Sequence, residues 1–175
     1  MKIAILGCGN MGTAYARSLR KYGLVKPEDL HLVIRGDAHR TRPETLGQVT
    51  TAIDAGISGS SLVIIAVKPQ DFGSIAPALA DVLRPEQVVL SIMAGITLER
   101  LKTSLRHATI VRAMPNAPAQ IGMGITAYAT GTELNMRQTL MIEQLLNCTG
   151  RAMHLADEAL LDPVHLEFLP HSFKS

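Results

Sequence analysis

The chain has 175 residues, of which 47% are hydrophobic and 3% aromatic, and its formal net charge is +2. This length and composition fit one globular domain with a sizeable core, and the small, dispersed charge argues against a nucleic-acid surface. No apolar stretch approaches the roughly 20 residues that span a bilayer, and a core strand follows Met1 directly, so we expect a cytoplasmic protein without a membrane segment.

A strand followed by a glycine-rich turn opens the chain. Residues 2–6 form a nearly continuous apolar run, which is typical of a parallel strand buried on both faces. The next six residues read G-C-G-N-M-G. In this pattern Gly7 permits a tight turn, Gly9 has no Cβ to block a pyrophosphate, and Gly12 allows close packing of the following helix. The pattern predicts that the chain binds a dinucleotide.

A helix is predicted directly after this turn, over residues 11–22, with Gly23 as its C-terminal cap. Amide groups at the start of such a helix face the phosphates, and the helix dipole also favours negative charge there. Strand, turn and helix thus stand in the order that a dinucleotide site requires, which favours binding over a merely structural glycine turn.

Cysteine and histidine residues show no pattern of a metal or redox site. Cys8 and Cys148 lie far apart, without a C-x-x-C or Cys/His ligand spacing, and Cys8 occupies a small-residue position inside the glycine turn. We therefore expect Cys8 to pack rather than react. The six histidines contain no H-x-x-x-H pair and no carboxylate at a metal-ligand spacing, so no metal is predicted.

The end of the second predicted strand, residues 30–34, bears on the choice of cofactor. In a dinucleotide-binding fold an Asp or Glu at this point accepts a hydrogen bond from the ribose 2′-hydroxyl of NAD, whereas an Arg pairs with the 2′-phosphate of NADP. Arg35 follows the strand here and precedes Gly36, which favours NADP. The alternative is a solvated arginine at a strand end, with part of its charge cancelled by Asp37.

Two further apolar strands end in loops on the ligand side of the sheet. The run at residues 62–67 stops at Lys68, and the run at residues 87–92 is followed by a loop of small residues. Loops that leave the carboxyl ends of parallel strands lie on the face where these folds bind ligands. Lys68 either helps to hold the phosphates or caps the sheet edge. The two loops add Ala66, Val67, Lys68, Pro69, Met93, Ala94 and Gly95 to the candidate site.

Helices are predicted after both of these loops. The first covers residues 71–83 and is perturbed by Pro77, and the second covers residues 98–105 with Thr97 as its N-cap. Each helix is long enough to cover part of a sheet face, which fits an alternating arrangement of strands and helices.

A short segment between two prolines forms another candidate element of the site. The strand predicted at residues 109–113 runs into M-P-N-A-P, where the prolines bracket Asn116. They fix the backbone and leave an amide side chain on a stiff loop at the carboxyl end of a strand. Asn116 is accordingly either an element of the site or part of an ordinary turn.

The last part of the pattern completes an α/β fold. A strand at residues 124–129 precedes an amphipathic helix at residues 135–149, for which Thr132 is the predicted N-cap, and residues 151–155 form a last edge strand. The alternation of strands and helices predicts a doubly wound, mostly parallel sheet of the Rossmann-like type.

Four segments of the sequence together resemble the cofactor domain of pyrroline-5-carboxylate reductase. They read GCGNMG, AVKPQ, SIMAGIT and VRAMPNAPAQIGMGITAY, in this order along the chain. The resemblance extends from residue 1 to about residue 162. It implies that the first turn holds the pyrophosphate, that the loops at residues 66–69 and 93–95 line the nicotinamide half, and that Asn116 lies beside it. The pyrophosphate residues implied in this way are Leu6, Gly7, Cys8, Gly9, Asn10 and Met11.

The resemblance also implies a reaction. This is hydride transfer from NADPH, or less well from NADH, to the C=N carbon of 1-pyrroline-5-carboxylate, the last step of proline biosynthesis. The protein would place that carbon within hydride reach, favour the protonated imine and hold the carboxylate. No residue is identified as a catalytic acid. The family is a homo-oligomer, and an all-helical domain after the cofactor domain forms the dimer and supplies most substrate contacts.

The sequence departs from the family in three places. Where the family usually has Asn-Arg-Ser or Asn-Arg-Thr after the second strand, this chain reads Ile34-Arg35-Gly36, so the NADP preference rests on Arg35. An Asn that the family often places before the fourth strand falls at about Ile53. Residues 163–175 do not resemble the segment that opens the helical domain, so residues 1–162 are expected to form the cofactor domain and residues 163–175 a tail outside the family pattern. We therefore expect cofactor binding with little turnover.

Two other functions fit the same residues. A non-catalytic module or regulatory relative would hold the dinucleotide and turn nothing over. A related NADP-dependent reductase of the 3-hydroxyacid dehydrogenase type would have a similar first domain. An assay of NADPH oxidation with 1-pyrroline-5-carboxylate separates the reductase from the non-catalytic module.

Overall fold

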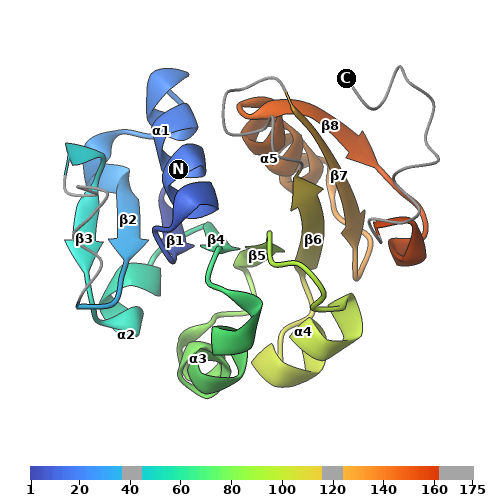
Figure 1. Ribbon diagram of the computed structural model, residues 1–175, viewed down its shortest axis with the longest axis horizontal. Coiled ribbons are helices and arrows are strands. Elements are labelled where there is room, and N and C mark those ends of the chain that lie inside the picture. Colours follow the sequence, from blue (N-terminus) through green and yellow to red (C-terminus); the bar gives the residue numbers. More distant parts are fainter. Residues whose placement is uncertain (37–44, 116–123, 162–175) are drawn as a thin grey trace.

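The computed structural model describes residues 1–36, 45–115 and 124–161, which form one eight-stranded sheet with helices on both faces (Figure 1). The strand order is β3-β2-β1-β4-β5-β6-β7-β8, and only β7 pairs antiparallel, with β6, among the described strands. The strands are β1 (Ile3–Leu6), β2 (Leu30–Val33), β3 (Gln48–Thr50), β4 (Leu62–Ile65), β5 (Val88–Ser91), β6 (Ile110–Pro115), β7 (Gly124–Thr130) and β8 (Gly150–His154). The predicted mostly parallel sheet is confirmed.

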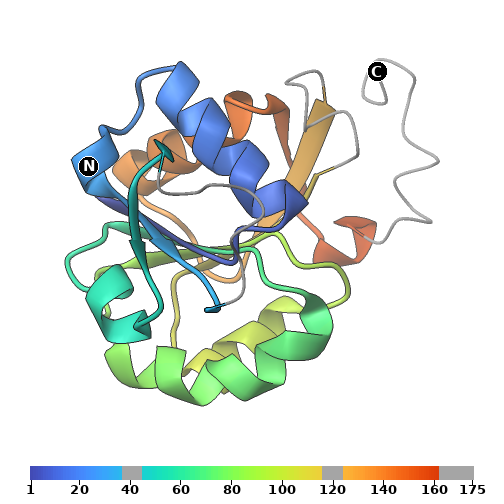
Figure 2. The same cartoon turned by 60° about the vertical axis from the view of Figure 1, so that its left-hand side comes forward.

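Helices cover both faces of this sheet. On one face lie α1 (Asn10–Lys21) and α5 (Met136–Asn147), and on the other lie α2 (Ile53–Ile57), α3 (Pro69–Val82) and α4 (Leu98–Leu105) (Figure 1; Figure 2). Two short 3-10 helices are η1 (Pro27–Asp29) and η5 (Glu158–Leu161). Because β1, β4 and β5 are buried at every position, each face has its own apolar layer, and the predicted doubly wound fold is confirmed.

The strand β1 lies between β2 and β4, and the three strands end level with one another. Leu6, the last residue of β1, aligns with Val33 of β2 and Ile65 of β4. The segments that leave these strands therefore start side by side at the carboxyl edge of the sheet. The glycine turn therefore lies next to the residues that follow β2 and β4. A dinucleotide site in this type of fold requires this arrangement.

The final strand is held at the sheet edge by a close backbone approach. β8 pairs parallel with β7, and Gly150 at its start faces Gly124. A side chain on Gly150 would overlap the Gly124 carbonyl oxygen, so glycine is required at this position. The predicted edge strand is confirmed, with a start one residue earlier than expected.

Two helix predictions need correction. The helix α3 begins at Pro69, two residues earlier than expected, and it includes Pro77, with Phe72, Ala76 and Leu79 buried. The N-cap of α5 is Asn135 rather than Thr132. Asn135 Oδ1 accepts from the Gln138 N–H at 2.8 Å, and Gln138 Oε1 accepts from the Asn135 N–H at 3.0 Å, which is a reciprocal capping box.

Some predictions fall on parts of the chain that the structure does not describe. Asp37, Asn116 and residues 163–175 lie outside the described ranges, so the expectations for them stay predictions. Within those ranges, none of the helices combines the length and the apolarity that a bilayer crossing requires.

Candidate dinucleotide-binding site

The glycine turn after β1 is built from two positions that exclude a side chain. Gly7 has a φ of +93°, which residues with a side chain rarely adopt, and a Cβ there would lie 2.8 Å from the Ala66 carbonyl oxygen. The Gly7 N–H donates to the Val33 carbonyl oxygen at 2.9 Å and ties the turn to β2. A Cβ on Gly12 would overlap the Gly7 carbonyl oxygen. Gly7 and Gly12 therefore fix the turn and the close approach of α1.

The third glycine, Gly9, leaves the space beside the turn open, since a Cβ there would meet nothing within 4 Å. Gly9 is also the N-cap of α1, so no side chain caps this helix, and its first turn contains no acidic residue. The helices α2 and α3 also lack a side-chain cap, whereas Asn135 caps α5 and Thr97 caps α4 as predicted, with its Oγ1 accepting from the Arg100 N–H at 3.2 Å. A helix N-terminus without a side-chain cap, beside open space, suits a diphosphate, because the helix dipole and the backbone amides favour an anion.

Cys8 lies inside the turn and is buried. Its carbonyl oxygen accepts a hydrogen bond from Thr13 Oγ1 at 3.0 Å, which links the turn to α1. Burial raises the pKa of the Cys8 thiol to about 11, so the thiol stays protonated at neutral pH. This supports the expected packing role, because the thiolate and not the thiol is the nucleophile.

The loop after β4 contacts the glycine turn. The Ala66 N–H donates to the Leu6 carbonyl oxygen at 2.8 Å, and a Cβ on Gly12 would lie 3.3 Å from the Ala66 Cβ. Lys68 is exposed at the N-cap position of α3, and Pro69 is the first residue of that helix. The structure thus brings Ala66 against the turn, and both interpretations of Lys68 are compatible with its position.

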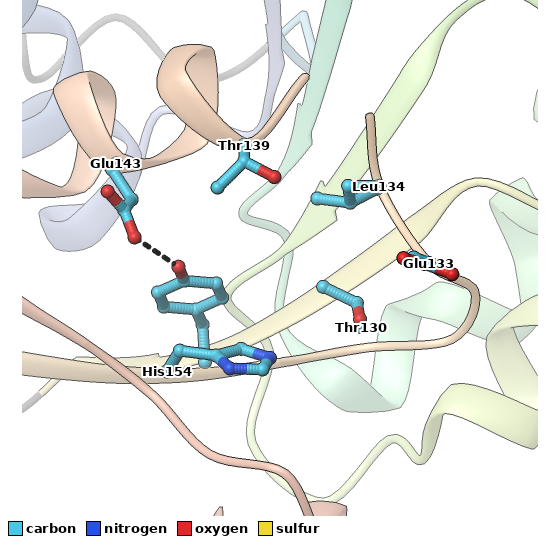
Figure 3. A pocket seen from close by; sticks show the side chains of 7 residues that line it. Thr130, Glu133, Leu134, Thr139, Glu143 and His154 are labelled. Carbon is cyan, nitrogen blue, oxygen red and sulfur yellow. Dashed lines mark hydrogen bonds between the residues drawn. The ribbon is translucent and has the colours of Figure 1, made fainter. Parts of the chain in front are cut away.

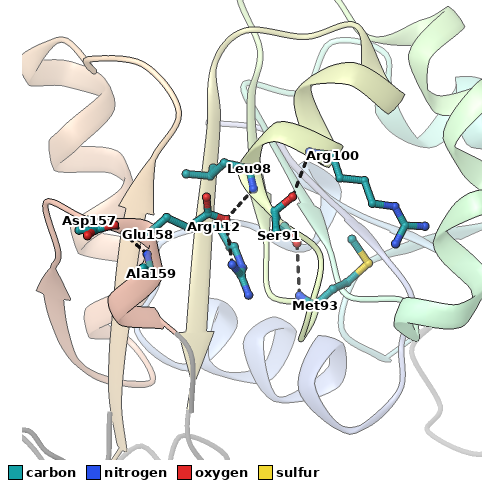
Figure 4. Close-up of polar contacts among 9 residues, drawn as sticks. Ser91, Met93, Leu98, Arg100, Arg112, Asp157, Glu158 and Ala159 are labelled. Atoms are coloured by element: carbon teal, nitrogen blue, oxygen red, sulfur yellow. Dashed lines mark hydrogen bonds and ion pairs between the residues drawn. The ribbon is translucent and has the colours of Figure 1, made fainter. Parts of the chain in front are cut away.

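The three predicted residues of the loop after β5 differ in exposure. Met93 is 2% exposed and packs in the apolar layer that α3 and α4 cover, and its N–H donates to Ser91 Oγ at 3.3 Å (Figure 4). Ala94 and Gly95 are exposed. The Met93 side chain therefore belongs to the core, and of the three residues only Ala94 and Gly95 are exposed.

Arg35 forms an ion pair that sequence reasoning missed. Its Nη2 lies 3.2 Å from Oδ1 of Asp71, and the two side chains are 66% and 30% exposed. Asp71 belongs to the first turn of α3, far from Arg35 in the sequence. The guanidinium therefore stays at the surface on the carboxyl side of the sheet, where the adenine ribose is expected, but a carboxylate accompanies it.

A largely buried ion pair joins β6, α4 and η5 next to the loop after β5 (Figure 4). Arg112 of β6 donates through Nη1 to Glu158 Oε1 at 2.8 Å, and the Leu98 N–H at the start of α4 donates to the same oxygen at 2.7 Å. The side chains of Arg112 and Glu158 are 8% and 28% exposed. No sequence signal pointed to this pair, because its members lie 46 positions apart. Through the Leu98 N–H, the pair holds the start of α4, which follows the loop that contains Ala94 and Gly95.

A separate pocket of about 240 Å³ lies against β7 and β8 (Figure 3). Its lining consists of Tyr128, Thr130, Glu133, Leu134, Thr139, Glu143 and His154. Tyr128 Oη donates to Glu143 Oε1 at 2.8 Å, and burial, followed by this hydrogen bond, raises the pKa of Tyr128.

This pocket is not part of the candidate site. Thr130 aligns with Val111 near the start of β6, so the pocket faces the amino edge of the parallel strands, away from the glycine turn. None of the predicted site residues lines it. Although two glutamates and a histidine share it, the described ranges contain no group of three or more His, Cys, Asp or Glu side chains that could hold a metal ion.

Comparison with known proteins identifies relatives over most of the chain. The family described as NADP oxidoreductase, coenzyme F420-dependent, matches residues 2–95. The pyrroline-5-carboxylate reductase of Pseudomonas aeruginosa is 32% identical over 93% of this chain and 60% of that protein. The enzyme of the same name from Mycobacterium tuberculosis is 30% identical over 91% of this chain and 56% of that protein. The chain thus spans less than two thirds of the length of these relatives.

Solved structures agree with these matches. A pyrroline-5-carboxylate reductase from Coxiella burnetii has a TM-score of 0.85 and 25% identity, over 91% of this chain and 60% of that one. The pyrroline carboxylate reductase of Plasmodium falciparum, solved with NADP bound, has a TM-score of 0.79 and 21% identity over 91% and 59%, which shows a common fold. The family match includes the glycine turn, so the cofactor class is a nicotinamide dinucleotide. The chain is homologous to the N-terminal domain of pyrroline-5-carboxylate reductases. It therefore belongs to the NADP oxidoreductase family described as coenzyme F420-dependent.

Proposed function

We propose that this chain is the dinucleotide-binding domain of a pyrroline-5-carboxylate reductase, which reduces 1-pyrroline-5-carboxylate to proline with NADPH. The observation that supports this most is the open space beside Gly9, at the N-terminus of a helix without a side-chain cap. The family match over residues 2–95 includes this turn, which supports a dinucleotide as the ligand of the open space. When bound, a reduced nicotinamide supplies a hydride for the C=N bond.

The residues of the candidate site have separate tasks in this proposal. Backbone groups between Leu6 and Gly12 bind the diphosphate, and the loops at residues 66–69 and 93–95 border the nicotinamide half. For Asn116, which lies outside the described ranges, a place beside the nicotinamide stays a prediction. All of these residues bind and orient, and the rate enhancement that they supply comes from placement rather than from proton transfer.

The boundary of the domain is placed at residue 162, and residues 163–175 are assigned to a tail outside the family pattern. The contacts to the substrate carboxylate and the contacts between subunits are expected from the helical domain that such reductases carry after the cofactor domain. The dinucleotide site needs neither of these, since the turn, both loops and the ion pairs described above lie within residues 1–161.

The proposal is tested with the purified 175-residue polypeptide, by titration with NADPH and by an assay of proline formation from 1-pyrroline-5-carboxylate. We expect NADPH to bind and proline to form slowly. Binding without proline formation would favour the second candidate, a non-catalytic dinucleotide-binding module. A folded chain that binds no dinucleotide would contradict both candidates.

Arg35 is assigned to the 2′-phosphate of NADP, which gives a first prediction. Arg35→Gln is expected to weaken NADPH binding about tenfold and to change NADH binding by less than about twofold, because NADH has no phosphate for the guanidinium to bind. Nicotinamide fluorescence measures both dissociation constants. Arg106→Gln is the matched control. Arg106 lies at the C-terminal end of α4 and forms a surface ion pair with Asp81 of α3. Equal weakening of both dinucleotides in Arg35→Gln would remove Arg35 from cofactor selection.

A further inference from the structure

The ion pair between Arg35 and Asp71 joins the two segments that flank the glycine turn. Arg35 follows β2, Asp71 lies in the first turn of α3 after β4, and β1 runs between these two strands. The pair therefore crosses the carboxyl edge of the sheet near the point where the glycine turn leaves β1. It is held by a 3.2 Å contact between Nη2 and Oδ1, and both side chains remain partly exposed.

This pair places the two kinds of side chain that distinguish NADP from NAD next to each other. In a dinucleotide-binding fold an arginine pairs with the 2′-phosphate of NADP, and a carboxylate accepts from the 2′-hydroxyl of NAD. Here the segment after β2 supplies the arginine, whereas the carboxylate comes from α3. An exposed ion pair contributes little to stability, so a substitution of Asp71 is expected to leave the chain folded.

We propose that Asp71 is a specificity-determining residue that lowers the preference for NADP by competing with the 2′-phosphate for Arg35. The proposal rests on the dinucleotide function proposed above. A phosphate that approaches Arg35 meets a guanidinium whose charge Asp71 already offsets, and the carboxylate itself repels the phosphate. NAD has no 2′-phosphate and does not meet this repulsion. The N-terminal turn of α3 favours negative charge and so stabilises Asp71 at this position.

The test compares Asp71→Asn with the unsubstituted chain by titration with NADPH and with NADH. We expect the dissociation constant of NADPH to fall about fivefold in the variant and that of NADH to change by less than about twofold. The gain should shrink as salt is added, because ions screen the repulsion that the variant removes. As competitors, 2′,5′-ADP should gain affinity in the variant and ADP should not, which makes the readout independent of the nicotinamide.

Asp81→Asn is the matched control for this experiment. Asp81 lies on the same helix, about 15 Å along its axis from Asp71, and forms an ion pair of 2.7 Å with Arg106. The control removes the same charge and should leave the ratio of the two dissociation constants unchanged. If the NADP preference rose equally in both variants, the effect would come from the change in net charge, and the proposal would be overturned.

Two further outcomes are decisive. An unchanged or lower NADP preference in Asp71→Asn overturns the role of Asp71 while the proposed function stands. A folded, unsubstituted chain that binds neither dinucleotide overturns the proposed function together with this inference. If Asp71→Asn does not fold by circular dichroism, Asp71→Ser replaces it, and the same change in the ratio is expected.

Discussion

The substitution Gly9→Val is expected to weaken dinucleotide binding strongly while the chain still folds. Gly9 has a φ of −75°, which residues with side chains adopt readily, and a Cβ there meets nothing within 4 Å. The substitution Gly9→Val is therefore compatible with the protein itself, but it fills the space that we assign to the diphosphate. We expect the affinity for NADPH to fall at least about a hundredfold, or about 2.7 kcal/mol, in a fluorescence titration.

Two other glycines make this prediction specific. Gly73→Val is the control, since Gly73 is exposed on α3 with nothing within 4 Å of a Cβ, and it should leave NADPH binding nearly unchanged. Gly12→Val should instead destabilise the fold, because its Cβ overlaps the Gly7 carbonyl oxygen. A folded Gly9→Val chain with undiminished affinity for NADPH would refute the placement of the diphosphate at this turn.

The glycine turn could be predicted because several of its constraints act within six residues, although the contacts with Ala66 and Val33 do not. The positive φ of Gly7 and the contact between Gly12 and the Gly7 carbonyl oxygen arise on the local path from strand to helix. The central strands were predictable for a similar reason, since burial on both faces leaves an apolar residue at each position. The helix at Leu98–Leu105 was predicted to the residue because its N-cap is also a local signal.

Contacts between distant segments could not be predicted from the sequence. Asp71 as the partner of Arg35, and Glu158 as the partner of Arg112, are ordinary charged residues until the strand order brings them together. The wrong N-cap of α5 is a different case. Thr132 and Asn135 are both suitable residue types, but Gln138 three positions after Asn135 completes a capping box, a local signal that distinguishes them.

The second prediction with a large effect concerns the pair of Arg112 and Glu158. Glu158→Ala is expected to lower the free energy of unfolding by about 3–4 kcal/mol, because a cation that is buried and loses its partner is costly. The Arg112 side chain is only 8% exposed, and the Leu98 N–H would lose the carboxylate that accepts its hydrogen bond at the start of α4. Urea unfolding followed by circular dichroism measures the change.

The two side chains of the pair differ in exposure, so replacing one or the other should differ in cost. Arg112→Met should cost less, about 1–2 kcal/mol, because Glu158 is 28% exposed and keeps its bond from the Leu98 N–H. The double variant should cost less than the sum of the two, since the second substitution no longer breaks an ion pair. Asp81→Ala, which breaks the exposed pair with Arg106, should cost less than about 1 kcal/mol. If Glu158→Ala proved as mild as Asp81→Ala, burial of the arginine would not be what makes this contact important, and η5 and α4 would have to be held on the sheet by their apolar contacts alone.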